Sequence, residues 1–354
     1  MFFKLSRFLS TTLIIGVSSL SLAIEVEKID FDKPTGGMPP PAAAAQIAIK
    51  AQAADEIAAE AKDAIYPEGI VSIPEKSPFA KNIFVVDKTK RWLRVYQSEN
   101  GLFKLIDEYP SDMGKKNGDK EKANDYKTPS GIYFLEKKLT QPEIPFSVYG
   151  SLAFATDYPN IFDKREFKTG TGIWLHAVPD KVALTRGSRG CVVVRNDVIK
   201  KLSPLVELKQ TPLVIFDQVN LLNEKDFKVH QKKYLDMFSQ WRIAWESQEI
   251  SKYMRYYDST FNGSKMNYKQ WFRHKEKLKK LYTYIKVQIS EPLLIVNKNQ
   301  IVFRFFQKYE SDKHTDYGEK TIHAKLTSDG DPGFTIIREE WRRMPPEVLN
   351  QITQ

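Results

Sequence analysis

The sequence is poor in cysteine, and the motifs of common cofactor sites are missing. Cys191 is the one cysteine among 354 residues, so it cannot be half of a disulfide within its own chain. The five histidines form neither a helical His-x-x-x-His pair nor a cysteine-linked zinc motif. Glycine-rich nucleotide-binding loops are absent as well, because Gly170-Thr171-Gly172 alone is too short. We therefore expect no metal and no cofactor.

Signatures of nucleic-acid binding are also missing, although 54 basic and 44 acidic residues give a net charge of +10. Such a charge favours anionic partners in general. No zinc knuckle, basic recognition helix or RNA-binding motif accompanies it. We expect no nucleic-acid partner, which leaves anionic polymers of the cell surface, or a basic protein without a specific anionic partner.

The N-terminus has the pattern of a secretory signal peptide. Lys4 and Arg7 precede a mostly apolar run from Leu9 to Leu22, and small residues around Ala23 resemble a cleavage site. The run is short for a membrane span, and no second apolar stretch of spanning length follows. We predict a signal peptide at 1–23 and a periplasmic protein. The alternative is an uncleaved membrane anchor.

Length and composition divide the rest of the chain. A chain of 354 residues is long for one compact domain. The segment 24–79 is predicted to be a linker and an alanine-rich helix, because prolines and glycines interrupt 24–41 whereas 42–64 has high helix propensity. Two domains are predicted to follow, at 80–217 and 224–345. The sequence does not indicate what helix 42–64 packs against.

The segment 80–217 is rich in strand patterns. Apolar runs predict strands at 83–87, 92–96, 102–109, 132–135, 173–176, 192–194 and 213–216. The lysine-rich stretch 111–127 is predicted to be an exposed loop, and Thr128-Pro129-Ser130-Gly131 the turn that follows it. Asn196 is predicted to cap a helix over 197–204. The result is a mainly β domain.

The pattern changes after residue 218. Aromatic and aliphatic residues recur at helical spacing over 224–260, which predicts a helix with an aromatic stripe facing the core. A second helix is predicted at 271–281. Strands are predicted at 283–290, 293–297, 300–309, 319–326 and 333–341. This order of helices and strands favours an α+β architecture in which helices pack on a curved antiparallel sheet.

Cys191 ends a turn that is bracketed by glycines, Arg186-Gly187-Ser188-Arg189-Gly190. The thiolate is the attacking form of cysteine, and an ordinary pKa near 8.5 leaves the thiol mostly protonated at neutral pH. His176, at the end of a predicted strand, can take that proton and leave an ion pair. Two alternatives remain from these residues: a nucleophile for acyl transfer, or a buried and inert cysteine.

The glycines of this turn have a predicted purpose. Gly187 and Gly190 permit unusual φ angles and close approach of the backbone. The backbone N–H groups near Gly190 and Cys191 can then face a developing oxyanion, which such donors stabilise in acyl transfer.

These motifs together resemble a known family. Thr128-Pro129-Ser130-Gly131, His176, and Ser188-Arg189-Gly190-Cys191 followed by Asn196 resemble the L,D-transpeptidase (YkuD-type) catalytic domain over about 80–217. The resemblance implies a β-sandwich whose cysteine is acylated by a peptidoglycan stem peptide. It makes Cys191 the nucleophile and His176 the general base. It further implies that a backbone carbonyl near Ser188 orients the imidazole.

The chain departs from the family pattern at three positions. Arg189 replaces a histidine, Ala177 a glycine and Val193 an arginine. Together with Thr185-Arg186-Gly187-Ser188, these changes resemble a subgroup of cell-shape L,D-carboxypeptidases from helical proteobacteria, which trim tetrapeptide stems to tripeptides. Members of that subgroup carry a C-terminal nuclear transport factor 2-like domain, a cone of helices on a curved sheet. The pattern of 224–341 independently predicts the same architecture.

Residues around the turn are candidates for substrate binding. Stem peptides present carboxylates, which arginine binds in a bidentate, charge-assisted way, so Arg186 and Arg189 are predicted substrate contacts. The alternative is a pair of solvated charges. Thr185, Ala177 and Trp174 are predicted to line the pocket, with a place in the core as the alternative for Trp174. Ser188 is predicted to assist through its hydroxyl or carbonyl.

The leading hypothesis is a cysteine L,D-carboxypeptidase that cleaves the diaminopimelate–D-Ala bond of peptidoglycan stem peptides. The first alternative is an L,D-transpeptidase, in which an amine rather than water resolves the same acyl-enzyme. The second is a non-catalytic wall-binding scaffold, because cones of this type have many functions. The C-terminal domain is expected to bind wall polymer or protein. The sequence does not decide whether the protein forms a homodimer.

Overall fold

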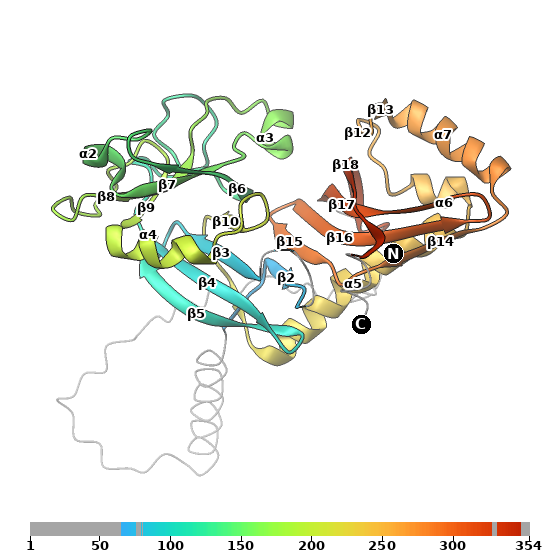
Figure 1. Ribbon diagram of the computed structural model, residues 1–354, viewed down its shortest axis with the longest axis horizontal. Coiled ribbons are helices and arrows are strands. Elements are labelled where there is room, and N and C mark those ends of the chain that lie inside the picture. The colour runs from blue at the N-terminus through green and yellow to red at the C-terminus, as the bar shows by residue number, and fades with distance from the viewer. Residues whose placement is uncertain (1–64, 76–78, 80, 328–330, 348–354) are drawn as a thin grey trace, which may run out of the picture. The chain divides into compact units, whose positions relative to one another are not determined.

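The computed structural model describes residues 65–75, 79, 81–327 and 331–347, all within one compact unit of the chain (Figure 1). The predicted signal peptide 1–23 and helix 42–64 lie outside the described residues. Within the part of the chain that is described, no helix is both long and apolar enough to cross a membrane.

An eight-stranded curled sheet dominates the first half of the described chain (Figure 1). In spatial order its strands are β5 (Leu102–Pro110), β4 (Trp92–Glu99), β3 (Asn82–Asp87), β10 (Pro212–Phe216), β6 (Gly131–Thr140), β7 (Leu152–Thr156), β8 (Trp174–Val178) and β9 (Val192–Arg195). The pairs β3/β10 and β8/β9 are parallel, and the other neighbours are antiparallel. The predicted mainly β domain is confirmed, although β7 was not predicted and β6 is longer than expected.

The middle of this sheet is buried on both faces. Phe84 and Val86 of β3 pack in one core with residues of α4 (Asn196–Leu202), which continues into a short 3-10 helix, η1 (Ser203–Leu205). Ile83 and Val85, on the other face, share a second core with residues of the C-terminal sheet such as Leu293. Burial on both faces explains why β3 and β10 are unbroken apolar runs rather than alternating patterns.

The C-terminal sheet follows the order β18 (Phe334–Arg343), β17 (Thr315–Leu326), β16 (Gln300–Ser311), β15 (Leu293–Asn297) and β2 (Ile70–Ser72), and β14 (Ile285–Ile289) also pairs with β16. The strand β2 comes from the segment 24–79, predicted as a linker and helix. In the same segment, β1 (Tyr66–Pro67) pairs with β11 (Leu221–Leu222). The end of the expected linker therefore belongs to the folded structure, because its apolar residues Ile70 and Ile73 are buried.

Three helices cover the C-terminal sheet: α5 (Glu224–Glu246), α6 (Ile250–Met254) and α7 (Tyr268–Leu281). The short strands β12 (Asn262–Gly263) and β13 (Met266–Asn267) precede α7. The α+β architecture is confirmed. The single helix predicted over 224–260 is wrong, because the chain breaks after Glu246 and Gln248 adopts a φ of 55°.

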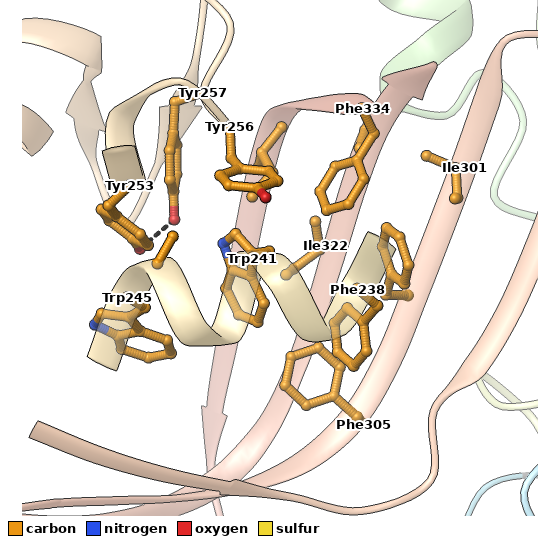
Figure 2. Packing of buried hydrophobic residues seen from close by; sticks show 14 of the residues in the cluster. Phe238, Trp241, Trp245, Tyr253, Tyr256, Tyr257, Ile301, Phe305, Ile322 and Phe334 are labelled. Atoms are coloured by element: carbon orange, nitrogen blue, oxygen red, sulfur yellow. Dashed lines mark hydrogen bonds between the residues drawn. The ribbon is translucent and has the colours of Figure 1, made fainter. Parts of the chain in front are cut away.

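The aromatic stripe of α5 faces the core, as predicted. Figure 2 shows Phe238, Trp241 and Trp245 along this helix, and these residues share one core with Phe305 of the sheet and with the tyrosines of 253–257. The Phe238 and Phe303 rings stack with centroids 4.8 Å apart. Asn223 caps the start of α5 by accepting the Asp226 N–H, and Asn267 forms a capping box with Gln270 at the start of α7.

Candidate active site

Two parallel strands present the predicted nucleophile and base on the same face. His176 lies opposite Val193 in the β8/β9 register, and Cys191 directly precedes β9. Side chains alternate along a strand. Trp174 and His176 therefore point into a cavity together with Cys191 and Val193, whereas Leu175, Ala177, Val192 and Val194 lie in the core.

The cavity has a volume of about 890 Å³ and is built from loops around these strand ends. Residues 145–149, which include the short helix α2 (Phe146–Tyr149), form one wall, and residues 182–184 another. Residues 170–172, together with Lys120, Ala123 and Asn124, contribute a third wall. Such a space is large enough for several residues of a peptide.

Asp112 fixes the turn that leads to Cys191. Its carboxylate accepts the backbone N–H groups of Arg186 at 2.6 Å and Gly187 at 2.9 Å, and it pairs with Arg91 at 2.7 Å. Its own backbone exchanges two hydrogen bonds with Val193. Asp112 belongs to the stretch 111–127, which was predicted to be an exposed loop. That expectation is wrong for residues 111–114, which are buried against β9.

Gly190 is required by the geometry of the turn, whereas Gly187 is not. Gly190 has a φ of 131°, and a Cβ there would lie 2.6 Å from the Lys127 carbonyl oxygen. A Cβ on Gly187 would meet open space, and the left-handed residue beside it is Arg186, with a φ of 48°. The prediction of special backbone geometry is therefore correct for Gly190 and wrong for Gly187.

Ser188 stabilises the turn through its hydroxyl. The hydroxyl donates to the Cys191 carbonyl at 2.8 Å and accepts the Gly190 N–H at 3.1 Å. The Gly190 N–H, which was predicted to face a developing oxyanion, is thus occupied by Ser188. The Ser188 carbonyl accepts the Lys115 N–H at 3.1 Å.

His176 is held as a neutral base. Its Nδ1 atom lies 2.6 Å from the Ala177 carbonyl oxygen, so the orienting carbonyl is that of Ala177 and not one near Ser188. A carbonyl can only accept, which places the proton on Nδ1 and leaves Nε2 free to accept one. Burial lowers the pKa of the imidazole to about 4, although the Ala177 contact opposes this shift. The Tyr149 ring packs edge-on against the imidazole, with centroids 5.0 Å apart.

Cys191 rests as a neutral thiol. Burial of its sulfur raises the pKa of the thiol to about 11, although the Trp174 backbone and the Lys120 charge oppose this shift. The Sγ atom lies 3.4 Å from the Gly172 carbonyl oxygen, an acceptor that suits S–H rather than S⁻. Burial thus raises the pKa of the thiol and lowers that of the imidazole, and both shifts disfavour the ion pair predicted from the sequence. Proton transfer must instead accompany attack on a substrate.

The other predicted site residues fall into two groups. Trp174, Ser188 and Arg189 line the cavity with Cys191 and His176. Thr185, Arg186 and Ala177 do not line it. Ala177 is fully buried in the core, and the Arg186 guanidinium bonds Asn117 in a neighbouring hollow. The predicted substrate contact through Arg186 therefore lacks a place in this cavity, whereas Arg189 is exposed at its edge.

The prediction that Asn196 caps a helix is wrong. Asn196 is the first residue of α4, and the N-cap residue of this helix is Arg195. The buried amide instead accepts the Ser151 N–H at 2.8 Å and donates to the Val178 carbonyl at 2.9 Å. It thereby joins the end of β8 to the loop before β7.

Sequence reasoning missed the cavity residues Lys120 and Tyr149. Lys120 lies in a polar stretch whose composition is typical of solvated loops, and no spacing marks it. Tyr149 belongs to a four-residue helix that has no periodic pattern. Among the described residues, no cluster of three or more His, Cys, Asp or Glu side chains is arranged to hold a metal ion.

Residues 81–215 match the L,D-transpeptidase catalytic domain (YkuD). Residues 233–340 match the Cds6 C-terminal NTF2-like domain. No curated protein matches the chain.

Solved structures match both halves at once. The structure of Bdellovibrio bacteriovorus Bd1075 is 48% identical, with a TM-score of 0.74, over 80% of this chain and 99% of that one. The helical cell shape determining protein Pgp2 from Campylobacter jejuni is 27% identical, with a TM-score of 0.59, over 78% of this chain and 95% of that one. The similarity therefore spans the two domains and their connection.

Proposed function

Because the chain belongs to the family that joins an L,D-transpeptidase (YkuD-type) catalytic domain to a C-terminal NTF2-like domain, we propose that it is a periplasmic cysteine L,D-carboxypeptidase. It trims stem tetrapeptides of peptidoglycan to tripeptides by cleaving the diaminopimelate–D-Ala bond. One observation carries this proposal: Cys191 and a neutral His176 open on the same 890 Å³ cavity from adjacent strands. The likeness to Pgp2, a helical cell shape determining protein, supports a role in cell shape.

The first half of the proposed reaction uses both neutral groups. Sγ of Cys191 attacks the carbonyl carbon of the diaminopimelate–D-Ala bond while Nε2 of His176 takes the thiol proton. The C–N bond then breaks, and the imidazolium returns the proton to the D-Ala nitrogen. D-Ala leaves, and the tripeptide is held as a thioester on Cys191. The backbone N–H of Cys191 is the oxyanion donor that we propose, since that of Gly190 bonds Ser188.

The second half restores the enzyme. Water attacks the thioester carbonyl as His176 takes one of its protons, and the C–S bond breaks. The tripeptide leaves with a new carboxylate, and the thiol regains its proton from the imidazolium. The Ala177 contact keeps Nδ1 protonated throughout, so that Nε2 carries every proton transfer.

The product spectrum tests this proposal. Purified full-length protein is incubated with defined tetrapeptide and pentapeptide muropeptides, and the products are separated and weighed by mass spectrometry. Tripeptide and free D-Ala in equal amounts, with one ¹⁸O from labelled water in the tripeptide, are expected from the tetrapeptide. Crosslinked dimers would instead establish the alternative, an L,D-transpeptidase in which an amine resolves the acyl-enzyme.

The scaffold alternative is tested separately, by acylation. A carbapenem forms a stable adduct with a competent cysteine nucleophile of this kind, and mass spectrometry of the intact protein detects the added mass. We expect one adduct on the wild-type protein and none on Cys191→Ser. An unmodified wild-type protein would favour a non-catalytic wall-binding role.

We further propose that the C-terminal domain positions the enzyme on wall polymer. The exposed face of α7 supports this, because it is strongly cationic: Lys269, Arg273, Lys277, Lys279 and Lys280 are exposed there beside the single acid Glu276. Stem peptides carry carboxylates, which such a face attracts. Lys277→Glu with Lys280→Glu should weaken binding to isolated sacculi and leave cleavage of soluble muropeptides unchanged.

Point substitutions are a better test than removal of the domain. Ile83 and Val85 of β3 share a buried core with Leu293 and Ile295 of the C-terminal sheet. A chain that ends near residue 220 would expose that core and lose stability for reasons unrelated to wall binding.

Export is tested by cell fractionation and N-terminal sequencing, with a new N-terminus at residue 24 expected. Retention of Met1 in the membrane fraction would indicate the anchor instead.

A further inference from the structure

One cation is built into the wall of the cavity. Lys120 is only 3% exposed, yet it lines the same space as Cys191 and Trp174. Among the described residues that line this cavity, the other charged side chains are Asp112 and Arg189, and His176 is neutral. Asp112 is already occupied by Arg91 and by the Arg186 turn. Arg189 is exposed. Of these charged side chains, Lys120 is therefore the cation that the fold buries in the cavity wall.

Two acceptors orient the Lys120 ammonium. Its Nζ atom donates to Asp125 Oδ1 at 2.8 Å and to the Lys122 carbonyl at 3.0 Å. An ammonium has three N–H donors, so one is left for a further acceptor. The two bonds restrict rotation of a side chain that is otherwise highly flexible, which reduces the entropy lost when a ligand binds.

The negative charge of Asp125 does not fully cancel the positive charge that Lys120 gives this wall. Besides Lys120, its carboxylate accepts the backbone N–H groups of Glu121, Lys122 and Lys127 at 2.8–3.1 Å. Burial would raise the pKa of this carboxyl, but the Lys120 bond and the backbone bonds hold it well below its usual range. The negative charge is thus spread over three backbone dipoles as well as the lysine.

The loop that carries Lys120 is fastened to the loop beside the catalytic strand. The Thr169 N–H donates to the Glu121 carbonyl at 2.9 Å, and the Ala123 N–H donates to Thr169 Oγ1 at 3.1 Å. Gly170, with a φ of 93°, passes so close that a Cβ would lie 3.1 Å from the Ala123 Cα and 3.4 Å from the Lys120 Cε. Lys120 therefore keeps a fixed position relative to β8 and the thiol.

We propose that Lys120 binds the terminal carboxylate of the substrate, one residue beyond the bond that Cys191 attacks. This inference rests on the proposed carboxypeptidase reaction, in which the leaving group is a single amino acid with a free carboxylate. A fixed ammonium in the wall beside the nucleophile suits that carboxylate, and it excludes chains that continue past this residue. Lys120 would then be a specificity residue that restricts cleavage to chain ends. Contact with a substrate carboxylate was predicted instead for Arg186 and Arg189.

The electrostatics of the thiol agree with this placement of Lys120. Burial raises the pKa of the Cys191 thiol, and the Lys120 charge is the smallest of the effects that oppose this rise. An ammonium that interacts electrostatically with Sγ is also near the acyl carbon of a bound substrate, and so near the residue that departs.

The test compares two substrates that differ in one group. One is the muropeptide tetrapeptide with its free D-Ala carboxylate, and the other is the same peptide ending in D-alaninamide. We expect the wild-type protein to have a kcat/KM for the acid about 10- to 100-fold above that for the amide, the range of a charge-assisted hydrogen bond. Lys120→Met should lower kcat/KM for the acid by that factor and leave the amide unchanged. Lys120→Arg should restore part of the preference.

Lys122→Met is the matched control, because Lys122 is an exposed lysine two residues away that does not line the cavity. It should keep the full preference for the acid. Equal loss on acid and amide in Lys120→Met would show that the lysine only supports the loop. A wild-type protein that cleaves both substrates equally would overturn the proposal without any variant.

Failure of the reaction itself can be told apart from failure of the lysine. If the wild-type protein cleaves neither substrate, the carboxypeptidase proposal is wrong, and protection of Cys191 from iodoacetamide still tests Lys120. N-acetyl-D-alanine, but not its amide, should then slow alkylation of the wild-type protein, and neither should slow it in Lys120→Met. Equal protection by acid and amide would overturn the role of Lys120.

Discussion

The catalytic cavity and the interior of the C-terminal domain both contain buried ionisable groups, but in opposite arrangements. In the cavity, Cys191 and His176 stay neutral, and both open on about 890 Å³ of space. In the C-terminal domain, Lys275, Lys320 and Glu339 lie among aromatic rings (Figure 2 shows Trp241, Trp245 and Tyr253). There Lys320 and Glu339 bind each other, Lys275 lies over aromatic rings, and the hollow beside them has a volume of about 10 Å³.

The C-terminal cluster satisfies itself internally. Lys320 pairs with Glu339 at 2.9 Å, and the Tyr257 hydroxyl donates to the other carboxylate oxygen. Lys275 lies over the Trp271 and Trp245 rings at 4.4 and 4.6 Å. Both regions therefore contain buried ionisable groups, and only the groups that face open space are placed to meet a substrate. Four substitutions test this contrast.

The largest effect is expected from Cys191→Ala. Removal of the nucleophile should lower kcat for tetrapeptide cleavage by about 10⁴-fold or more, because no acyl-enzyme can form. Binding of the muropeptide should persist, since the cavity walls stay in place. Lys275→Met should leave this activity unchanged. Full trimming by Cys191→Ala would refute the thiol mechanism.

A smaller loss is expected from His176→Gln, about 10²- to 10⁴-fold in kcat/KM, because the general base is removed. In the wild-type protein, kcat/KM should rise with pH through about 4, as the imidazole loses its proton, and then stay level. A rise centred near 6.5 would contradict the buried, neutral base.

His323→Gln is the matched control for this prediction. Burial lowers the pKa of His323 to about 4 as well, yet this residue lies in β17 of the C-terminal sheet and does not line the cavity. If the contrast between the two regions is correct, His323→Gln keeps the wild-type pH profile and rate.

Much of the fold and the centre of the site were predictable, because they depend on local patterns. The strands predicted at 83–87 and 213–216 are nearly continuous apolar runs, and His176 and Cys191 belong to a compact motif. Contacts between distant segments were not predictable. Asp112 binds the turn at 186–187, and Lys120 depends on Thr169 of another loop. The break at Gln248 reflects tertiary packing, since the helical pattern continues through it.

Gly190→Ala should destabilise the protein by about 2–4 kcal/mol, because it combines an unfavourable φ with a close contact to the Lys127 carbonyl. Activity should fall with it, since Cys191 is the next residue. Gly187→Ala is the matched control. A Cβ there meets open space, so its unfolding free energy should stay within about 0.5 kcal/mol of wild type. Urea unfolding measures both, and equal effects would show that the turn does not depend on Gly190.

The smallest expected effect concerns Lys275 and has the opposite sign. Burial and the Lys320 charge lower the pKa of Lys275 to about 7, although the Glu339 charge opposes this shift. The pKa of a lysine in the unfolded chain is near 10.5. Between these values the unfolded state binds more protons, so stability rises with pH from about 7 to 10.5. Below pH 7 both states are protonated, and the cost of burying the ammonium is at its largest.

Lys275→Met removes this cost while Glu339 keeps its bonds to Lys320 and Tyr257. The variant should therefore be more stable than wild type by roughly 1–2 kcal/mol at pH 6, and the gain should vanish toward pH 10. Urea unfolding at pH 6, 8 and 10 measures it, with the exposed Lys277→Met of the same helix as control. A variant less stable than wild type at every pH would mean that the contacts of the ammonium with the Trp271 and Trp245 rings outweigh its desolvation. The interior of the C-terminal domain would then favour a buried cation, unlike the cavity, where burial favours neutral groups.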